Sequence, residues 1–252
     1  MSILPRASEH AYPHRNLHGQ IVHALGRQIL RGDLQPGDPL PVRPGPGASR
    51  TALREAIKVL AAKGLVEARP KVGTRVRPRD AWNLLDPDVL AWLREGAPRL
   101  PFLRQLTEVR QIVEPAAAGL AATRATATEI EAIARAYGEM EAAVAAGDVD
   151  AFVRADMRFH GAILQACRNE LLDQMSRTVY SALAVSFQAT SRVPGSAKAA
   201  LPRHRAILEA IRARRPARAV AAMRRLVRAT AREIEALSPA ALAAAGRPTR
   251  RR

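Results

Sequence analysis

Hydrophobic positions in the first third of the chain predict two helices followed by a hairpin. The first helix covers residues 17–31, where apolar residues recur every four positions: Leu17, Ile21, Leu25 and Ile29. The second covers 49–63, with Ser49 as a suitable N-cap. Two short β-prone pieces, LVEA and TRVR, then flank a turn near Gly73. Helix, loop, helix and hairpin is the order of a winged helix-turn-helix.

From Leu100 to about Leu237 the pattern is helical throughout. Runs such as EIEAIARAYGEMEAAVAAG use strong helix formers, with turn signals at 147–148, 169 and 193–196. The predicted fold is therefore mainly α. The expected organisation is a flexible arm (1–15), a winged helix-turn-helix (16–79), a linker (80–99), a helical domain (100–238) and a disordered basic tail (239–252). We expect a short helix in the linker to dock on the chain that comes after it.

Charge and cysteine content narrow the class of protein. The net charge is +17, which attracts polyanions such as nucleic acid. Residues 43–79 hold ten Lys or Arg and two acidic residues, so much of this charge falls on the predicted winged helix. A single cysteine, Cys167, excludes an internal disulfide and fits a reducing compartment. With no signal peptide or apolar span in the sequence, we expect a cytoplasmic protein that does not enter a membrane.

The start of the second helix carries residue types that contact DNA. An Arg at the N-terminus of a recognition helix can bridge two acceptors of guanine, while hydroxyl groups hold phosphates. A glycine at the hairpin tip lets the backbone approach the groove. An ordinary solvated helix face would also explain the basic residues, but the hairpin after this helix favours DNA binding. The predicted DNA-binding residues are Arg43, Ser49, Arg50, Thr51, Arg54, Lys71, Gly73 and Thr74.

The stretch SRTALREAIKVLAAKGLVEARPKVGTRV resembles the DNA-reading half of GntR-type bacterial transcription regulators. The helical remainder resembles the ligand-sensing domain of the FadR-like subgroup. Within it, WNLLDPDVLAWL and LTEVRQIVEPAAAGLAA look most like galactonate-responsive regulators of sugar-acid catabolism. The resemblance implies a homodimer that binds a palindromic operator on double-stranded DNA, and a helical domain for ligand binding and dimerisation.

The interval between Pro41 and Ser49 departs from this family. GntR-type regulators place a short helix there, whereas this chain reads VRPGPGA, which Pro and Gly keep from forming a helix. The first helix of the helix-turn-helix pair is therefore predicted to be missing or replaced by a loop. We expect the head to be less stable and to bind DNA more weakly than its relatives.

Asp156, His160 and His204 form a candidate metal and effector site. Asp156 and His160 share one helix face, and these residue types bind zinc, nickel or manganese. From spacing alone, a buried His paired with Asp is the favoured reading. The family resemblance shifts the balance, because such sensing domains often hold one divalent metal with an Asp and three His. Leu226 stands at the expected fourth ligand and weakens the prediction.

Arg110 is a candidate effector-binding residue. Arg110 and Glu114 lie four apart, a spacing that usually gives only helix support. In the resembling family the matching Arg reaches into the cavity, and a guanidinium can bind a carboxylate with two hydrogen bonds.

The sequence therefore predicts a ligand-responsive transcription regulator that is not an enzyme. Of the kinds of regulator, it favours a repressor. Its operon would serve catabolism of a sugar acid or other carboxylate, and a small carboxylate would be its effector. One alternative is a sensor or interaction protein with impaired specific DNA binding. The other is a metal-dependent enzyme built on Asp156, His160 and His204, but no hydrolase-like spacing such as H-E-x-x-H accompanies these residues.

Overall fold

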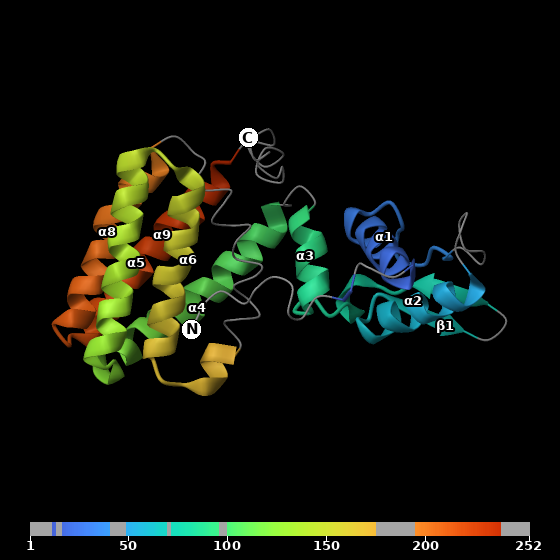
Figure 1. The fold of residues 1–252 in the computed structure, drawn as a ribbon, viewed down its shortest axis with the longest axis horizontal. Coiled ribbons are helices and arrows are strands. Elements are labelled where there is room, and N and C mark those ends of the chain that lie inside the picture. The colour runs from blue at the N-terminus through green and yellow to red at the C-terminus, as the bar shows by residue number, and fades with distance from the viewer. Residues whose placement is uncertain are drawn as a thin grey trace. The chain divides into compact units, whose positions relative to one another are not determined.

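The computed structural model describes residues 12–13, 17–40, 49–69, 72–95, 100–174 and 195–237. The predicted loop at 41–48 with Arg43, the hairpin residue Lys71, the basic tail and nearly all of the N-terminal arm lie outside these residues. Tertiary contacts divide the chain into two units, with the boundary between residues 96 and 97. Both units are drawn in Figure 1.

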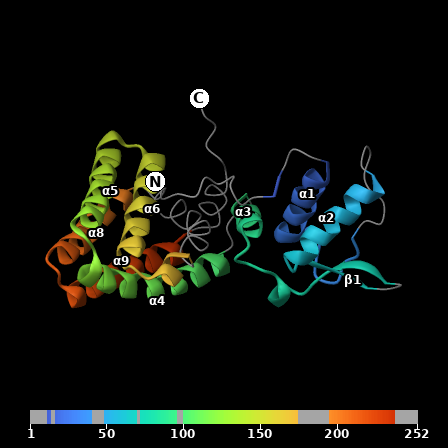
Figure 2. The same cartoon turned by 60° about the horizontal axis from the view of Figure 1, so that its bottom comes forward.

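The first unit, hereafter the head, contains the predicted helices and hairpin. Its elements are α1 (Leu17–Arg31), α2 (Arg50–Ala62), β1 (Val66–Arg69), β2 (Gly73–Val76), the 3-10 helix η1 (Arg79–Ala81) and α3 (Pro87–Glu95). The strands are antiparallel and pair Val66 with Val76 and Arg69 with Gly73. Figure 2 shows α2 beside α1 in the head, as does Figure 1. The prediction of a helix after Ser49 followed by a short hairpin is confirmed.

Helix α3 belongs to the core of the head. The expectation that this helix docks on the chain after it is wrong, because α3 packs on α1, which precedes it. The physical reason is Trp92, which is 1% exposed and lies directly over Gly26 of α1. A Cβ atom at Gly26 would come within 2.4 Å of the indole ring. Glycine is therefore required for this close approach of the two helices.

Polar contacts of His23 and of Lys63 fasten α3 and the residues before it to the head. The indole N–H of Trp92 donates to His23 Nδ1 at 2.9 Å, and His23 Nε2 contacts the carbonyl oxygen of Tyr12 at 2.9 Å. Lys63, at the end of α2, lies 2.6 Å from Asp88 Oδ2 and 2.9 Å from Asp86 Oδ1. These buried and half-buried contacts fix α3 relative to α1 and α2.

The second unit, hereafter the sensing unit, is helical over its described residues. It contains α4 (Leu100–Arg124), α5 (Ala127–Ala146), α6 (Val149–Ala166), α8 (Ser196–Arg212) and α9 (Pro216–Glu235). Helix α4 packs along α9, and α5 lies beside α6 in both Figure 1 and Figure 2. The turn predicted at 147–148 ends α5 at Gly147, whose φ is +67°, and starts α6 with Asp148 as N-cap.

Small residues make the core of the sensing unit. Alanines of all five helices are buried there, with larger side chains such as Phe159 and Met140 between them. Small side chains allow the helices to pack closely, so polar groups that face inward are removed from water. None of the described helices is long and apolar enough to cross a membrane.

Candidate functional site

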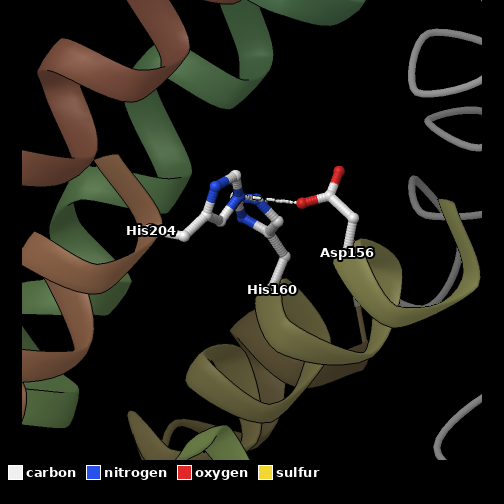
Figure 3. Close-up of side chains that lie close together, drawn as sticks. All are labelled: Asp156, His160 and His204. Atoms are coloured by element: carbon white, nitrogen blue, oxygen red, sulfur yellow. Dashed lines mark hydrogen bonds and ion pairs between the residues drawn. The ribbon is translucent and has the colours of Figure 1, made fainter. Parts of the chain in front are cut away.

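Three predicted ligand residues meet inside the sensing unit. Helix α6 places Asp156 and His160 one turn apart, and α8 brings His204 against them, so the three side chains point toward one another (Figure 3). His204 Nε2 lies 2.8 Å from Asp156 Oδ1 and 3.3 Å from His160 Nε2. His160 Nε2 lies 3.5 Å from the same carboxylate oxygen. All three residues are buried, with relative exposures of 1–4%.

The other ring nitrogens of the two histidines face acceptors. His204 Nδ1 lies 2.9 Å from the carbonyl oxygen of Ala200, which can only accept a hydrogen bond. His160 Nδ1 lies 3.0 Å from Glu114 Oε2, a carboxylate oxygen. A proton on each Nδ1 suits these neighbours. In the neutral rings this leaves the Nε2 lone pairs, which point at each other and at Asp156.

Glu114 also holds the predicted effector residue Arg110. Arg110 Nε donates to Glu114 Oε1 at 2.7 Å, and Nη2 donates to Oε2 at 3.4 Å. Both side chains are almost fully buried, at 1% and 3% exposure. The helical spacing of four predicts their pairing. It does not reveal that Glu114 also contacts His160, because that contact joins two helices far apart in sequence.

The site favours charged forms of its acids and of one histidine. Burial by itself would raise the pKa of Glu114, but Arg110 and His160 lower it to about 2. Burial likewise opposes the lowered pKa of Asp156, which His204 and His160 bring well below its usual range. Burial would lower the pKa of His160, yet the carboxylates of Glu114 and Asp156 raise it to about 9. The two carboxylates therefore favour a positive charge beside His160, either its own proton or a cation in its place.

The arrangement fits a bound cation. Two neutral imidazole nitrogens and a carboxylate oxygen are all acceptors, so without a proton or a cation between them they repel one another. Ligand atoms that share a zinc ion at about 2.0–2.1 Å lie roughly 3 Å apart, similar to the distances observed here. The carboxylate and the carbonyl behind the two rings are the orienting partners typical of metal-bound histidines. Among the described residues, this is the one His, Cys, Asp and Glu cluster with metal-ligand spacing.

A small cavity opens beside the three residues. Its volume is about 30 Å³, and its wall includes Leu226, the residue at the expected fourth-ligand position. Four polar residues that the sequence pattern does not single out also line it: Ser196, Arg203, Thr230 and Glu233. They come from α8 and α9, and no short motif connects them.

The predicted DNA-contacting residues of the head lie at the N-terminus of α2 and on the hairpin. Ser49 caps α2 by accepting from the Ala52 backbone N–H at 3.1 Å. Arg50, Thr51 and Arg54 are exposed in the first turns of the helix. Lys58, on the same face, is engaged by Glu55 at 2.8 Å.

The hairpin presents its tip with a left-handed glycine. Gly73 has a φ of +88° and open space around it, whereas Thr74 is half-buried. Arg75 does not point away from the protein, because Nη1 donates to the carbonyl oxygen of Gly37 at 2.7 Å. The described part of the hairpin thus exposes backbone at Gly73, while the Arg75 side chain is engaged in a hydrogen bond within the head.

Comparison with known proteins identifies both units. The pattern of bacterial regulatory proteins, gntR family, matches residues 17–76, and the FCD domain pattern matches residues 105–229. The chain belongs to the GntR family. The GntR head corresponds to the winged helix described above, and the FCD domain to the sensing unit.

Similar proteins of known sequence support the assignment over most of the chain. The galactonate operon transcriptional repressor of Escherichia coli K12 is 39% identical over 77% of this chain and 86% of its own length. The HTH-type transcriptional regulator YieP of the same strain, described as uncharacterised, is 31% identical over 82% and 91%. A solved structure of Lar, which controls the expression of the Listeria monocytogenes agr system, shares the fold with a TM-score of 0.62. It is 19% identical, and the match covers 90% of this chain and all of that one.

This GntR-family chain is a DNA-binding transcription regulator, as its sequence predicts. Its family and its relatives are regulators rather than enzymes, which confirms that prediction as well. The fold class is confirmed too, with a winged helix-turn-helix before a helical FCD domain.

Proposed function

We propose that this GntR-family regulator represses an operon for catabolism of a sugar acid or a related carboxylate. It acts in the cytoplasm, where it can reach the chromosome, and it releases the operator when its effector binds the sensing unit. Support comes from the similarity to a galactonate operon repressor over 77% of the chain. The observation that carries the proposal is the buried convergence of Asp156, His160 and His204 beside a cavity.

In this proposal the three residues hold one divalent ion, zinc, nickel or manganese. Their side chains offer two imidazole nitrogens and one carboxylate oxygen, which suit these metals. When bound, the ion supplies positive charge that attracts an effector carboxylate. Leu226 supplies no ligand atom, so water or effector completes the coordination. Substituting Leu226→His should add a fourth ligand and tighten metal binding.

Arg110 also faces the same cavity in our proposal. Its guanidinium is held rigidly by Glu114, so it adds fixed positive charge to the wall and can meet an effector carboxylate without a large rearrangement. Arg110 is thus an effector-binding residue in the proposal.

The operator contacts are assigned to the exposed start of α2 and to the hairpin. In the proposal Ser49, Arg50, Thr51 and Arg54 enter the major groove, while Gly73 and Thr74 contact the adjacent DNA backbone; the exposure of Arg50, Thr51 and Arg54 supports this. Arg43 and Lys71 are also proposed to contact DNA, and for these two residues the support is the sequence alone. A homodimer would present two such heads to the half-sites of a palindrome, and the effector would change their spacing or mobility.

Fluorescence anisotropy with labelled DNA from the gene's own upstream region tests the proposal. Arg54→Ala should weaken specific binding by about 10- to 100-fold, since an arginine that reads a base contributes about 1–3 kcal/mol. Lys58→Ala is the matched control on the same helix, and its effect should be smaller because Glu55 already engages Lys58. Addition of an aldonate should release the DNA.

One alternative function, a sensor without specific DNA binding, is supported by a specific feature of the sequence. The sequence VRPGPGA stands where GntR relatives place a helix, and loss of that helix would leave a sensor without specific DNA binding. If the full-length protein binds no fragment of its own upstream region even at low salt, the repressor proposal fails and this alternative takes its place.

A further inference from the structure

The cavity beside the metal-ligand residues has two chemically different sides. Its inner side is formed by Asp156, His160 and His204, which are buried and directed at one point. A second, less buried part of the lining carries Ser196 at the start of α8 and Glu233 on α9. The inner side can fix one charged end of an effector, so this second side meets the rest of the molecule.

Glu233 is the centre of this second side, hereafter the polar wall, which comprises Ser196, Arg203, Thr230 and Glu233. Ser196 Oγ donates to Glu233 Oε2 at 3.1 Å, and Arg203 Nη1 lies 3.6 Å from Glu233 Oε1. A carboxylate offers about four acceptor positions, so these two contacts leave capacity for further donors. Thr230 contributes a hydroxyl group whose contact with the Leu226 carbonyl is long, at 3.4 Å.

The polar wall combines acceptors and donors at close quarters. The carboxylate of Glu233 only accepts, the guanidinium of Arg203 only donates, and the hydroxyl groups of Ser196 and Thr230 do both. A ligand hydroxyl group also does both, so it can pair with any of these groups. An alkyl chain would instead strip them of water without replacing the hydrogen bonds, which is costly. A second ligand carboxylate would meet the negative charge of Glu233.

We infer that the polar wall, and Glu233 above all, makes the site specific for a polyhydroxylated monocarboxylate over an unsubstituted carboxylate. This inference rests on the proposed function, in which the sensing unit binds a carboxylate effector. It adds the residues that recognise the rest of that effector. The four residues are thus specificity determinants, while the carboxylate end is bound by the inner side.

The size of the cavity indicates how the hydroxyl groups enter. A volume of about 30 Å³ is room for little more than a water molecule. A sugar acid therefore competes with Ser196 for Glu233, and its hydroxyl groups replace the Ser196 contact. Because Ser196 is the first residue of α8, binding of the effector displaces the start of the helix that also carries His204.

Calorimetric titration of the full-length protein with zinc present tests the inference. The probes are D-galactonate and hexanoate, which share a six-carbon chain and one carboxylate and differ in their hydroxyl groups. The wild-type protein should bind galactonate at least tenfold more tightly than hexanoate. Glu233→Gln should weaken galactonate binding by about 10- to 100-fold, the range for hydrogen bonds to a charged acceptor, and leave hexanoate binding unchanged.

Two further variants separate recognition from folding. Thr230→Val keeps the side-chain shape and removes one hydroxyl group, so it should weaken galactonate binding alone, by less than Glu233→Gln. Glu235→Gln removes a carboxylate from the same helix, but its partner is the exposed Arg104 and it does not line the cavity, so it should bind both acids as the wild type does. Circular dichroism melts of each variant check that the fold is retained.

The outcomes distinguish the inference from the function on which it rests. Equal galactonate affinity of the wild type and a folded Glu233→Gln variant overturns the role of the polar wall and leaves a carboxylate effector in place. Equal wild-type affinity for hexanoate and galactonate overturns the specificity in the same way. If neither these acids nor other aldonates bind the zinc-loaded protein, both the inference and the effector part of the proposed function fail.

Discussion

The two units of this regulator each bury histidine, with opposite consequences. In the head, His23 Nδ1 accepts from the Trp92 N–H and its Nε2 faces the carbonyl of Tyr12, so a neutral ring satisfies both neighbours. In the sensing unit, the Nε2 atoms of His160 and His204 face each other and Asp156, although all three are acceptors when the rings are neutral. The first arrangement is complete with neutral rings. The second needs positive charge between its acceptors, which a proton on His160 or a bound cation supplies.

The comparison shows what separates a structural histidine from a ligand. Burial does not separate them, because His23 and His160 are both buried, at 3% and 1% exposure. Nor does the presence of hydrogen bonds, since both rings have them. The difference lies in whether the second ring nitrogen meets a donor or acceptor that complements it. Where it meets other acceptors, the site is suited to a cation.

The largest effect is expected at the carboxylate that both histidines contact. Asp156→Asn keeps the size of the side chain but removes its charge, so zinc affinity should fall by about 100-fold or more, beyond the 10- to 100-fold typical of outer-shell changes. Calorimetric titration of the metal-free protein measures this. Asp150→Asn, on the same helix and away from the cavity, is the control. If Asp156→Asn bound zinc as tightly as the wild type, the histidines of the sensing unit would not be metal ligands of the kind described, and the contrast with His23 would be lost.

The next effect tests the carboxylate behind His160. Glu114→Gln removes the negative charge that holds the Nδ1 proton of His160, so zinc affinity should fall by about 10- to 100-fold. In the zinc-loaded protein, where His160 is a neutral ligand, nitrogen NMR shifts of the imidazoles should show this ring losing its single tautomer. Glu139→Gln, which removes a carboxylate from a partly exposed pair with Arg158, should leave both readouts unchanged. A purely structural Glu114 would alter stability without altering the tautomer.

In the head, a histidine substitution should act on stability alone. His23→Leu leaves the buried Trp92 N–H without its acceptor, so the head should lose about 1–3 kcal/mol of stability. Both tryptophans, Trp82 and Trp92, lie in the head, so intrinsic fluorescence follows its unfolding in urea. Zinc affinity should equal that of the wild type. A loss of zinc binding in this variant would contradict the separation of roles.

The last comparison, which includes the smallest effect, is between two glycine substitutions, one of them at the contact that fixes α3. Gly26→Ala places a methyl group against the Trp92 ring and should destabilise the head by about 1–3 kcal/mol, partly offset by better helix propensity. Gly138→Ala, in the middle of α5, meets open space and should stabilise the sensing unit by about 0.5–1 kcal/mol. The same substitution thus has opposite signs in the two units. Equal effects in urea melts would show that α3 is not held as described.

Local patterns predict the helices and the hairpin because each is encoded within a few residues. Ser49 starts α2, Gly147 ends α5, and Asp156 and His160 share one face of α6 through their spacing of four. The docking of α3 is not predictable in this way, because it depends on Gly26 leaving room for a tryptophan far away in sequence.

The same limit applies to the candidate site. His204 can be proposed as a partner of Asp156 from family resemblance. The contact of Glu114 with His160, however, joins α4 to α6, and no short spacing in the sequence indicates it. The polar wall is likewise assembled from α8 and α9, where Ser196 and Glu233 meet only through the packing of these helices.

X-ray absorption spectroscopy of the metal-loaded, full-length protein tests the central claim most directly. After loading with nickel or zinc and extensive dialysis, we expect one ion per chain, with two imidazoles and carboxylate oxygen among its ligands. His204→Ala should retain little metal, and His23→Leu should give the wild-type spectrum. A chain that retains no ion, or an ion bound without two imidazoles, would contradict the assignment of Asp156, His160 and His204 as a metal site.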